Sequence, residues 1–154
     1  MKVEVGDIKS KNKLMMYKNY AQILKPILGG NIGARSIDVI AAILFYTNKI
    51  YKEHSSLDSL RKELGTLKAK EAIRNLVTTI HADDKKPYSY SIEEEYFKVI
   101  ISDLRKRGFI YEDKNASLRE KTVMLKSAKI FNVALSDDEE IDFTIKVSTN
   151  GRNN

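Results

Sequence analysis

The chain has 154 residues, of which 42% are hydrophobic and 31% charged, a balance that excludes a disordered chain and predicts one globular domain. Its longest apolar run, residues 39–46, is too short to span a membrane, and the lack of cysteine excludes disulfides and thiolate metal sites. The N-terminal segment has no secretory signal, which predicts a cytoplasmic protein, and the net charge of +6 permits a polyanionic partner.

The first predicted helix covers residues 14–24, where Tyr17, Tyr20 and Leu24 recur at helical spacing. The glycine-rich segment 29–33 ends this element. We expect the two tyrosines to pack in the core or in a dimer interface, because such spacing is typical of a buried helix face.

A second helix is predicted over residues 37–51, and its apolar side chains lie nearly all round it. Such a helix is expected to be the buried, central one. A short helix then follows a cap at Ser55 or Ser56 and stops at Gly65, since glycine is the residue that most often ends a helix.

Two further helices are predicted, the first over residues 67–80 after a cap at Thr66. The other spans residues 91–107 and is closed by Gly108. Each has one apolar stripe. The stripe residues are Ala69, Ile73, Leu76, Val77 and Ile80 in the first helix and Phe97, Ile100, Ile101 and Leu104 in the second.

After Gly108 the pattern changes to that of β-strands. "FIYE" at 109–112 and "TVMLK" at 122–126 predict a pair of strands, and alternating apolar residues at 131–135 and 141–147 predict a second hairpin across an acidic loop. Between Lys114 and Lys129 the charge is strongly positive. The basic residues are Lys114, Arg119, Lys121, Lys126 and Lys129, against one acidic residue, Glu120.

The order helix, glycine, strand, basic loop, strand in "VIISDLRKRGFIYEDKNASLREKTVMLK", residues 99–126, resembles the winged helix-turn-helix family. The likeness covers about residues 37–126. It implies an α+β, mostly helical fold in which one helix enters the major groove of DNA. The basic loop, called the wing in that family, would lie along the phosphates.

The chain is also similar, more weakly, to RepL-type replication initiators of plasmids and phages. The likeness rests on the central apolar helix before the helix–wing unit and on "KTVMLKSAKIF" after it. Lys126 and Ser127 stand where that family usually has Asn-Pro. This resemblance implies a phage- or plasmid-encoded protein that acts in transcription regulation or DNA replication.

The predicted organisation is a single domain over residues 1–154. It comprises an N-terminal extension and helix (1–35), a winged-helix core (36–126), a C-terminal β-hairpin (127–147) and a flexible tail (148–154). We expect a homodimer formed through the 14–24 helix or the C-terminal hairpin.

Sequence-specific binding to double-stranded DNA is the function that these patterns favour. The predicted DNA-binding residues are Lys68, Lys70, Arg74, Lys98, Ser102, Arg105, Lys106, Lys114, Arg119, Lys121 and Lys126. Either predicted helix, 67–80 or 91–107, could be the one that reads the groove. The second begins with three glutamates, at positions 93–95, which suit a helix N-terminus but repel phosphate.

The alternative function is a protein-interaction module on the same fold, docking on a polymerase, a replication protein or a host defence protein. The acidic segments "SIEEE" and "SDDEEID" favour it, since they suit a basic partner. The two histidines, His54 and His81, have no neighbours at metal-ligand spacing, and no catalytic arrangement is evident. We therefore expect no enzymatic activity, no cofactor and no metal.

Overall fold

The computed structural model describes residues 5–26, 32–80 and 92–135, with side chains from Asn12 onward. The helices are α1 (Val5–Leu24), α2 (Ala34–Ile50), α3 (Leu57–Glu63), α4 (Leu67–Ile80), α5 (Glu94–Lys106) and α6 (Ala128–Val133), and a 3-10 turn, η1 (Tyr51–Glu53), follows α2. The described part is mostly helical, as the sequence predicted. None of its helices is long and apolar enough to cross a membrane.

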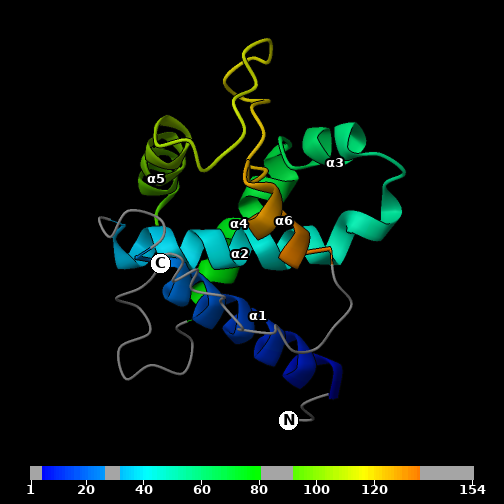
Figure 1. The fold of residues 1–154 in the computed structure, drawn as a ribbon, viewed down its shortest axis with the longest axis vertical. Helices are drawn as coiled ribbons and strands as arrows, with labels where there is room; N and C mark the ends of the chain where they lie inside the picture. Colours follow the sequence, from blue (N-terminus) through cyan, green and yellow to red (C-terminus); the bar gives the residue numbers. More distant parts are fainter. Residues whose placement is uncertain (1–4, 27–31, 81–91, 136–154) are drawn as a thin grey trace, which may run out of the picture.

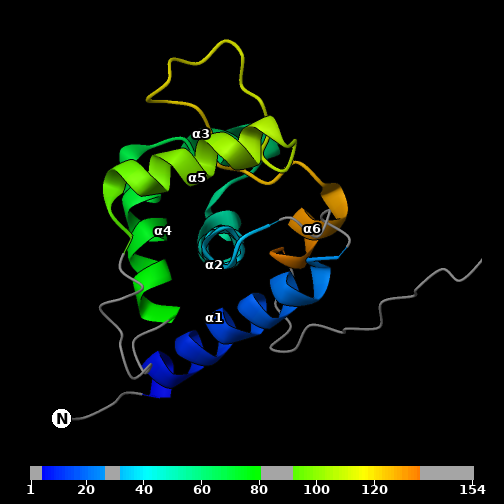
Figure 2. The same ribbon diagram turned by 90° about the vertical axis from the view of Figure 1, so that its left-hand side faces the viewer.

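Helix α2 is the centre of the fold, which confirms the prediction for residues 37–51. Figure 2 looks nearly along its axis and shows α1, α4, α5 and α6 arranged around it. Buried residues on several sides of the helix, from Ile37 to Ile50, form the middle of one hydrophobic core that reaches from α1 to α6. Each large apolar side chain buried in this way contributes about 1.5–3 kcal/mol relative to an exposed one.

Helix α1 lies across α2 at the end of the molecule opposite to α3 and α5 (Figure 1). Leu14, Tyr17 and Leu24 are buried on its inner face, so the sequence stripe marked this face correctly. Tyr17 therefore packs within the chain. The helix begins at Val5, well before the predicted start. The sequence did not indicate this first part, because residues 9–13 are polar and show no apolar periodicity.

The two predicted caps after α2 are confirmed. The amide of Ser59 donates to Ser56 Oγ at 3.1 Å at the start of α3, and the amide of Ala69 donates to Thr66 Oγ1 at 3.1 Å at the start of α4. Helix α5 begins at Glu94, three residues after the predicted start, and its N-cap residue, Glu93, makes no side-chain cap bond. The hydroxyl caps at Ser56 and Thr66 satisfy backbone amides that have no partner within their helices.

The predicted C-terminal β-hairpin is wrong in its first half, because residues 128–133 form α6. Phe131, Val133 and Leu135 alternate in sequence, but Ile130 and Ala134 also pack on the core, and the set of five has the three- and four-residue spacing of a helix. Asn48 Nδ2 on α2 donates to the Ala134 carbonyl at 3.0 Å and ties α6 to the central helix. The second predicted strand, 141–147, lies outside the described residues, as does the tail.

The predicted strand pair 109–112 and 122–126 is reduced to one antiparallel bridge between Ile110 and Leu125. The amides of Tyr111 and Lys126 donate across this bridge to Met124 and Phe109, each at 2.9 Å. Beyond the bridge the two arms separate and are held by other elements, so residues 111–122 form a projecting loop. We call this segment the 111–122 loop.

Candidate nucleic-acid interface

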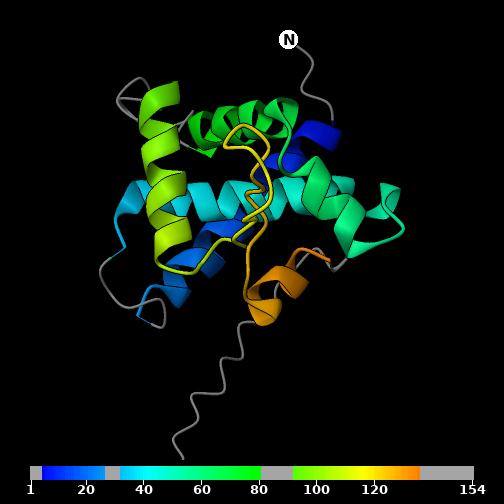
Figure 3. The same ribbon diagram turned by 90° about the horizontal axis from the view of Figure 1, so that it is seen from above.

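Three elements share one end of the molecule: α5, the 111–122 loop and α3. Seen from above that end in Figure 3, the loop rises between α5 on one side and α3 on the other. Figure 1, which shows that end from the side, has the loop projecting beyond both helices. The segment that carries Lys114, Arg119 and Lys121 is therefore the most prominent feature of this face.

Gly108 turns the chain from α5 into the base of the loop. Its φ is +83°, a left-handed conformation that is accessible to glycine and strained for most other residues. The amides of Gly108 and Phe109 donate to the carbonyls of Arg105 (3.1 Å) and Leu104 (2.9 Å), which closes the helix. The sequence predicted this stop correctly.

The second arm of the loop is held against the turn between α3 and α4. The amide of Val123 donates to the Leu64 carbonyl at 3.0 Å. The carbonyl of Glu120 lies directly over Gly65, in the space that a side chain there would need. Gly65 was predicted only as a helix stop, but the structure gives it this second role.

Lys70 on α4 completes this anchor. Its Nζ donates to the carbonyl of Arg119 at 2.7 Å, so the lysine holds the loop backbone. Desolvation lowers the pKa of Lys70 from its ordinary value, and the nearby charge of Arg105 adds to the effect. Lys70 is therefore a support for the loop, with its ammonium already engaged within the chain.

Helix α5 is joined to the loop through Arg105, whose side chain is only 12% exposed. Its Nη2 donates to the Thr122 carbonyl at 3.4 Å, and its Nε lies 3.7 Å from Glu112 Oε2. Glu112 Oε1 also lies 3.7 Å from Lys121 Nζ. One carboxylate thus bridges two of the predicted DNA-binding residues at the base of the loop.

On the other side, Arg61 of α3 holds the first arm. Its Nη1 lies 3.4 Å from Asp113 Oδ2, its guanidinium lies 5.3 Å from the centre of the Tyr111 ring, and it is hydrogen-bonded to Asp58. None of these residues is among the predicted DNA-binding residues. Arg61 sits on a short helix far from the loop in sequence, and nothing local indicates that its partners come from residues 111–113.

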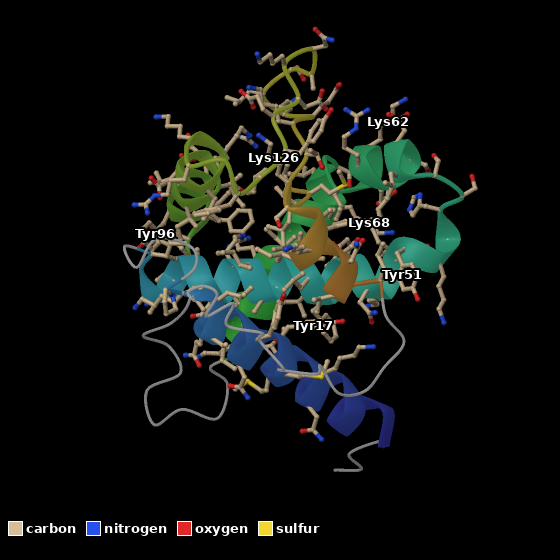
Figure 4. All side chains as sticks on the ribbon, in the orientation of Figure 1. Tyr17, Tyr51, Lys62, Lys68, Tyr96 and Lys126 are labelled. Carbon is tan, nitrogen blue, oxygen red and sulfur yellow. The ribbon has the colours of Figure 1, made fainter. Side chains whose placement is uncertain are left out.

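The predicted DNA-binding residues thus fall into groups that the sequence could not distinguish. Lys70, Arg74, Arg105 and Lys121 make contacts within the chain, and for Arg74 the acceptor is the Ile92 carbonyl at 3.1 Å. Ser102 is half-buried. Of the predicted residues, the exposed cations whose side chains form no ion pair or hydrogen bond with another residue in the described part of the chain are Lys68, Lys106, Lys114, Arg119 and Lys126. Figure 4 labels Lys68 and Lys126.

Lys98, on the surface of α5, is exposed but forms ion pairs within its own helix. Its Nζ lies 3.4 Å from Glu95 Oε1 and 3.5 Å from Glu94 Oε2, and these carboxylates, Glu95 first, raise the pKa of Lys98. The lysine offsets part of the negative charge at the N-terminal turn of α5. Exposed pairs of this kind contribute little to stability and are easily exchanged for other partners.

Comparison of this chain with protein-family models, with curated proteins and with solved structures finds no match. The described residues contain no group of three acidic or histidine side chains that could hold a metal ion.

Proposed function

We propose that this protein binds double-stranded DNA through α5 and the 111–122 loop, as a winged helix-turn-helix protein in which the loop is the wing. The observation that carries the proposal is the placement of α5 and the loop side by side at one end of the molecule (Figure 3). A rigid helix next to a projecting loop that exposes cations is an arrangement that can engage a groove and the adjacent phosphates together.

Of the two helices left open by the sequence, α5 is the one we assign to the major groove. Lys70 on α4 is engaged with the loop, and Arg74 donates to the carbonyl of Ile92, two residues before α5 begins. Only Lys68 of that set is exposed and without such a contact. The outer face of α5 carries Val99 and Lys106, both exposed. A helix of this kind fits a major groove about 12 Å wide.

The loop cations supply affinity in this proposal. Lys114 and Arg119 lie in the loop, Lys126 follows its second arm, and all three are exposed. Phosphate contacts from such side chains release condensed counterions, so they strengthen binding at low salt without selecting a base sequence. Transcription regulation and replication-origin binding both require this kind of duplex recognition, and we propose one of these roles.

The first experiment selects binding sites from random duplexes and then titrates salt on a retained duplex. Five cations are expected to reach phosphates, namely Lys98, Lys106, Lys114, Arg119 and Lys126. The logarithm of affinity should then fall against the logarithm of salt concentration with a slope of about −4 to −6. A flat titration, or a selection that retains no duplex, would overturn the proposal.

A matched pair of double variants tests where the DNA lies. Lys114→Gln with Arg119→Gln should make the salt slope shallower by about 2, because two phosphate contacts are lost. Lys25→Gln with Lys49→Gln removes the same charge from exposed positions just after α1 and on α2, and it should leave the slope nearly unchanged. Equal effects from both pairs would mean that only net charge matters and that this face is not the binding site.

A protein-interaction module is the second candidate, and α5 carries the observation that favours it. Tyr96 and Val99 are exposed there, 48% and 61%, beside three exposed glutamates at positions 93–95. Such a surface suits a basic, partly apolar partner such as a polymerase or replication protein. Tyr96→Ala with Val99→Ala should then abolish capture of that protein, whereas Lys114→Gln with Arg119→Gln should leave it intact.

A further inference from the structure

Leu118 is displayed to solvent by an ordered turn in the 111–122 loop. The amides of Glu120 and Lys121 both donate to the Ser117 carbonyl, at 2.9 and 3.1 Å, so Leu118 and Arg119 occupy the two middle positions of the turn. Leu118 is 79% exposed, which is the highest value among the exposed large hydrophobic side chains of the described residues. No packing role within the described part of the chain explains this leucine.

The backbone that carries Leu118 is held in place. Lys70 Nζ binds the carbonyl of the next residue, Arg119, at 2.7 Å, and the Glu120 carbonyl rests on Gly65. The turn therefore presents an apolar side chain and a guanidinium from a supported position. Because this backbone is already ordered, little conformational entropy is lost when a ligand buries Leu118.

The neighbours of Leu118 restrict the chemistry of that ligand. Lys114, Asn115, Ser117 and Arg119 are exposed in the same loop, and Glu120 is the exposed carboxylate of the turn. A protein partner would favour a wider apolar patch, whereas here one leucine stands among cationic and hydrogen-bonding groups. A single apolar side chain next to an arginine is the combination that enters a minor groove and separates a base step.

We propose that Leu118 is an apolar wedge, which enters the DNA minor groove with Arg119 beside it, partly unstacks a base step and bends the duplex. This inference rests on the proposed function and describes how the wing would recognise DNA. The wedge favours sites with a flexible pyrimidine–purine step next to the major-groove contact, since these steps unstack most easily. Leu118 would then select sequence through the deformability of the base step.

The test measures DNA bending on a duplex retained by the selection, with donor and acceptor dyes at its two ends. Wild type should bend it by about 20–90° toward the major groove. Leu118→Ala should bend it much less and bind about tenfold more weakly, with the same salt slope, because a contact with bases and not with phosphates is lost. Leu118→Met should retain most of the bend, since methionine also serves as a wedge.

A 2-aminopurine placed in the flexible step reports the unstacking itself, and its fluorescence should rise with wild type and not with Leu118→Ala. Leu57→Ala is the matched control, because Leu57 is also an exposed leucine (60%) but lies on α3 outside the proposed contacts. It should bend and bind as wild type does.

Two results overturn the inference, and they differ from each other. If wild type binds the selected duplex without bending it, or if Leu118→Ala bends and unstacks it equally, the wedge is refuted while DNA binding stands. If the selection retains no duplex at all, the proposed function fails and the wedge fails with it.

Discussion

Gly65 and Glu120 are in direct contact, and the Glu120 carbonyl oxygen occupies the space that a Cβ on residue 65 would need. This contact and the bond from the Val123 amide to the Leu64 carbonyl fasten the second arm of the 111–122 loop to the turn between α3 and α4. The position of the loop therefore depends on a residue that is far from it in sequence.

Replacing Gly65 with alanine should lower the free energy of unfolding by about 1–3 kcal/mol, because the new methyl group overlaps backbone that cannot move without breaking the anchor. Urea unfolding followed by circular dichroism measures the change. Gly33→Ala is the control, since a Cβ there meets nothing within 4 Å, and it should cost less than about 1 kcal/mol. Equal stability of the two variants would contradict the close contact.

Gly108→Ala isolates a backbone effect. A Cβ at this position meets nothing within 4 Å, but φ is +83°, so the whole cost comes from the left-handed conformation. We expect a loss of about 1–2 kcal/mol in the free energy of unfolding, and a smaller loss for Gly108→Asn, because asparagine tolerates this region better than alanine. If alanine were accepted without loss in a denaturant titration, the left-handed turn would be wrong.

Arg105 and Lys106 are adjacent but should respond differently to substitution by glutamine. Arg105→Gln removes the contacts to Thr122 and Glu112 and should cost about 1–2 kcal/mol of stability. Lys106 is exposed, so Lys106→Gln should change stability by less than about 0.5 kcal/mol and mainly weaken DNA binding at low salt. Unfolding curves and duplex titrations on both variants check this, and the reverse pattern would disprove the assignment.

Tyr17 should make the protein sensitive to alkali. Burial raises the pKa of Tyr17 well above its ordinary value of 10.0, and Tyr51 adds to the shift. The folded state then holds the phenolic proton more tightly than the unfolded state. The contribution of the protonated Tyr17 to the free energy of unfolding is therefore complete below about pH 10 and falls as the pH rises further. Tyr17→Phe should make the urea midpoint decline less between about pH 9 and 11.

Part of that decline should remain in the variant, because burial also raises the pKa of Tyr20 and Tyr46. Tyr96→Phe is the control, since Tyr96 is exposed (48%), and its urea midpoint should follow the wild-type pH dependence. A Tyr17→Phe profile identical to wild type would show that ionisation of this tyrosine is not coupled to unfolding.

The helices could be predicted from the sequence because their signals are local. Apolar residues three and four apart mark the buried face of α4 and α5, and Ser56 and Thr66 cap helices within a few residues of themselves. Where the local signal was short it failed. Residues 131–135 alternate like a strand, yet the segment forms helix α6 and its apolar side chains pack against the core around α2.

By itself, the sequence determined the helix periodicity, the buried central helix, the stop at Gly108 and the excess of positive charge after Lys114. Only the tertiary structure decided which cations remain exposed: Lys70 and Arg105 turn inward to hold the loop, while Lys106 and Arg119 stay at the surface. The reason is physical. A helix face is set by neighbours three or four residues away, whereas a partner such as the Arg119 carbonyl, 49 residues from Lys70, is brought near only by the path of the folded chain.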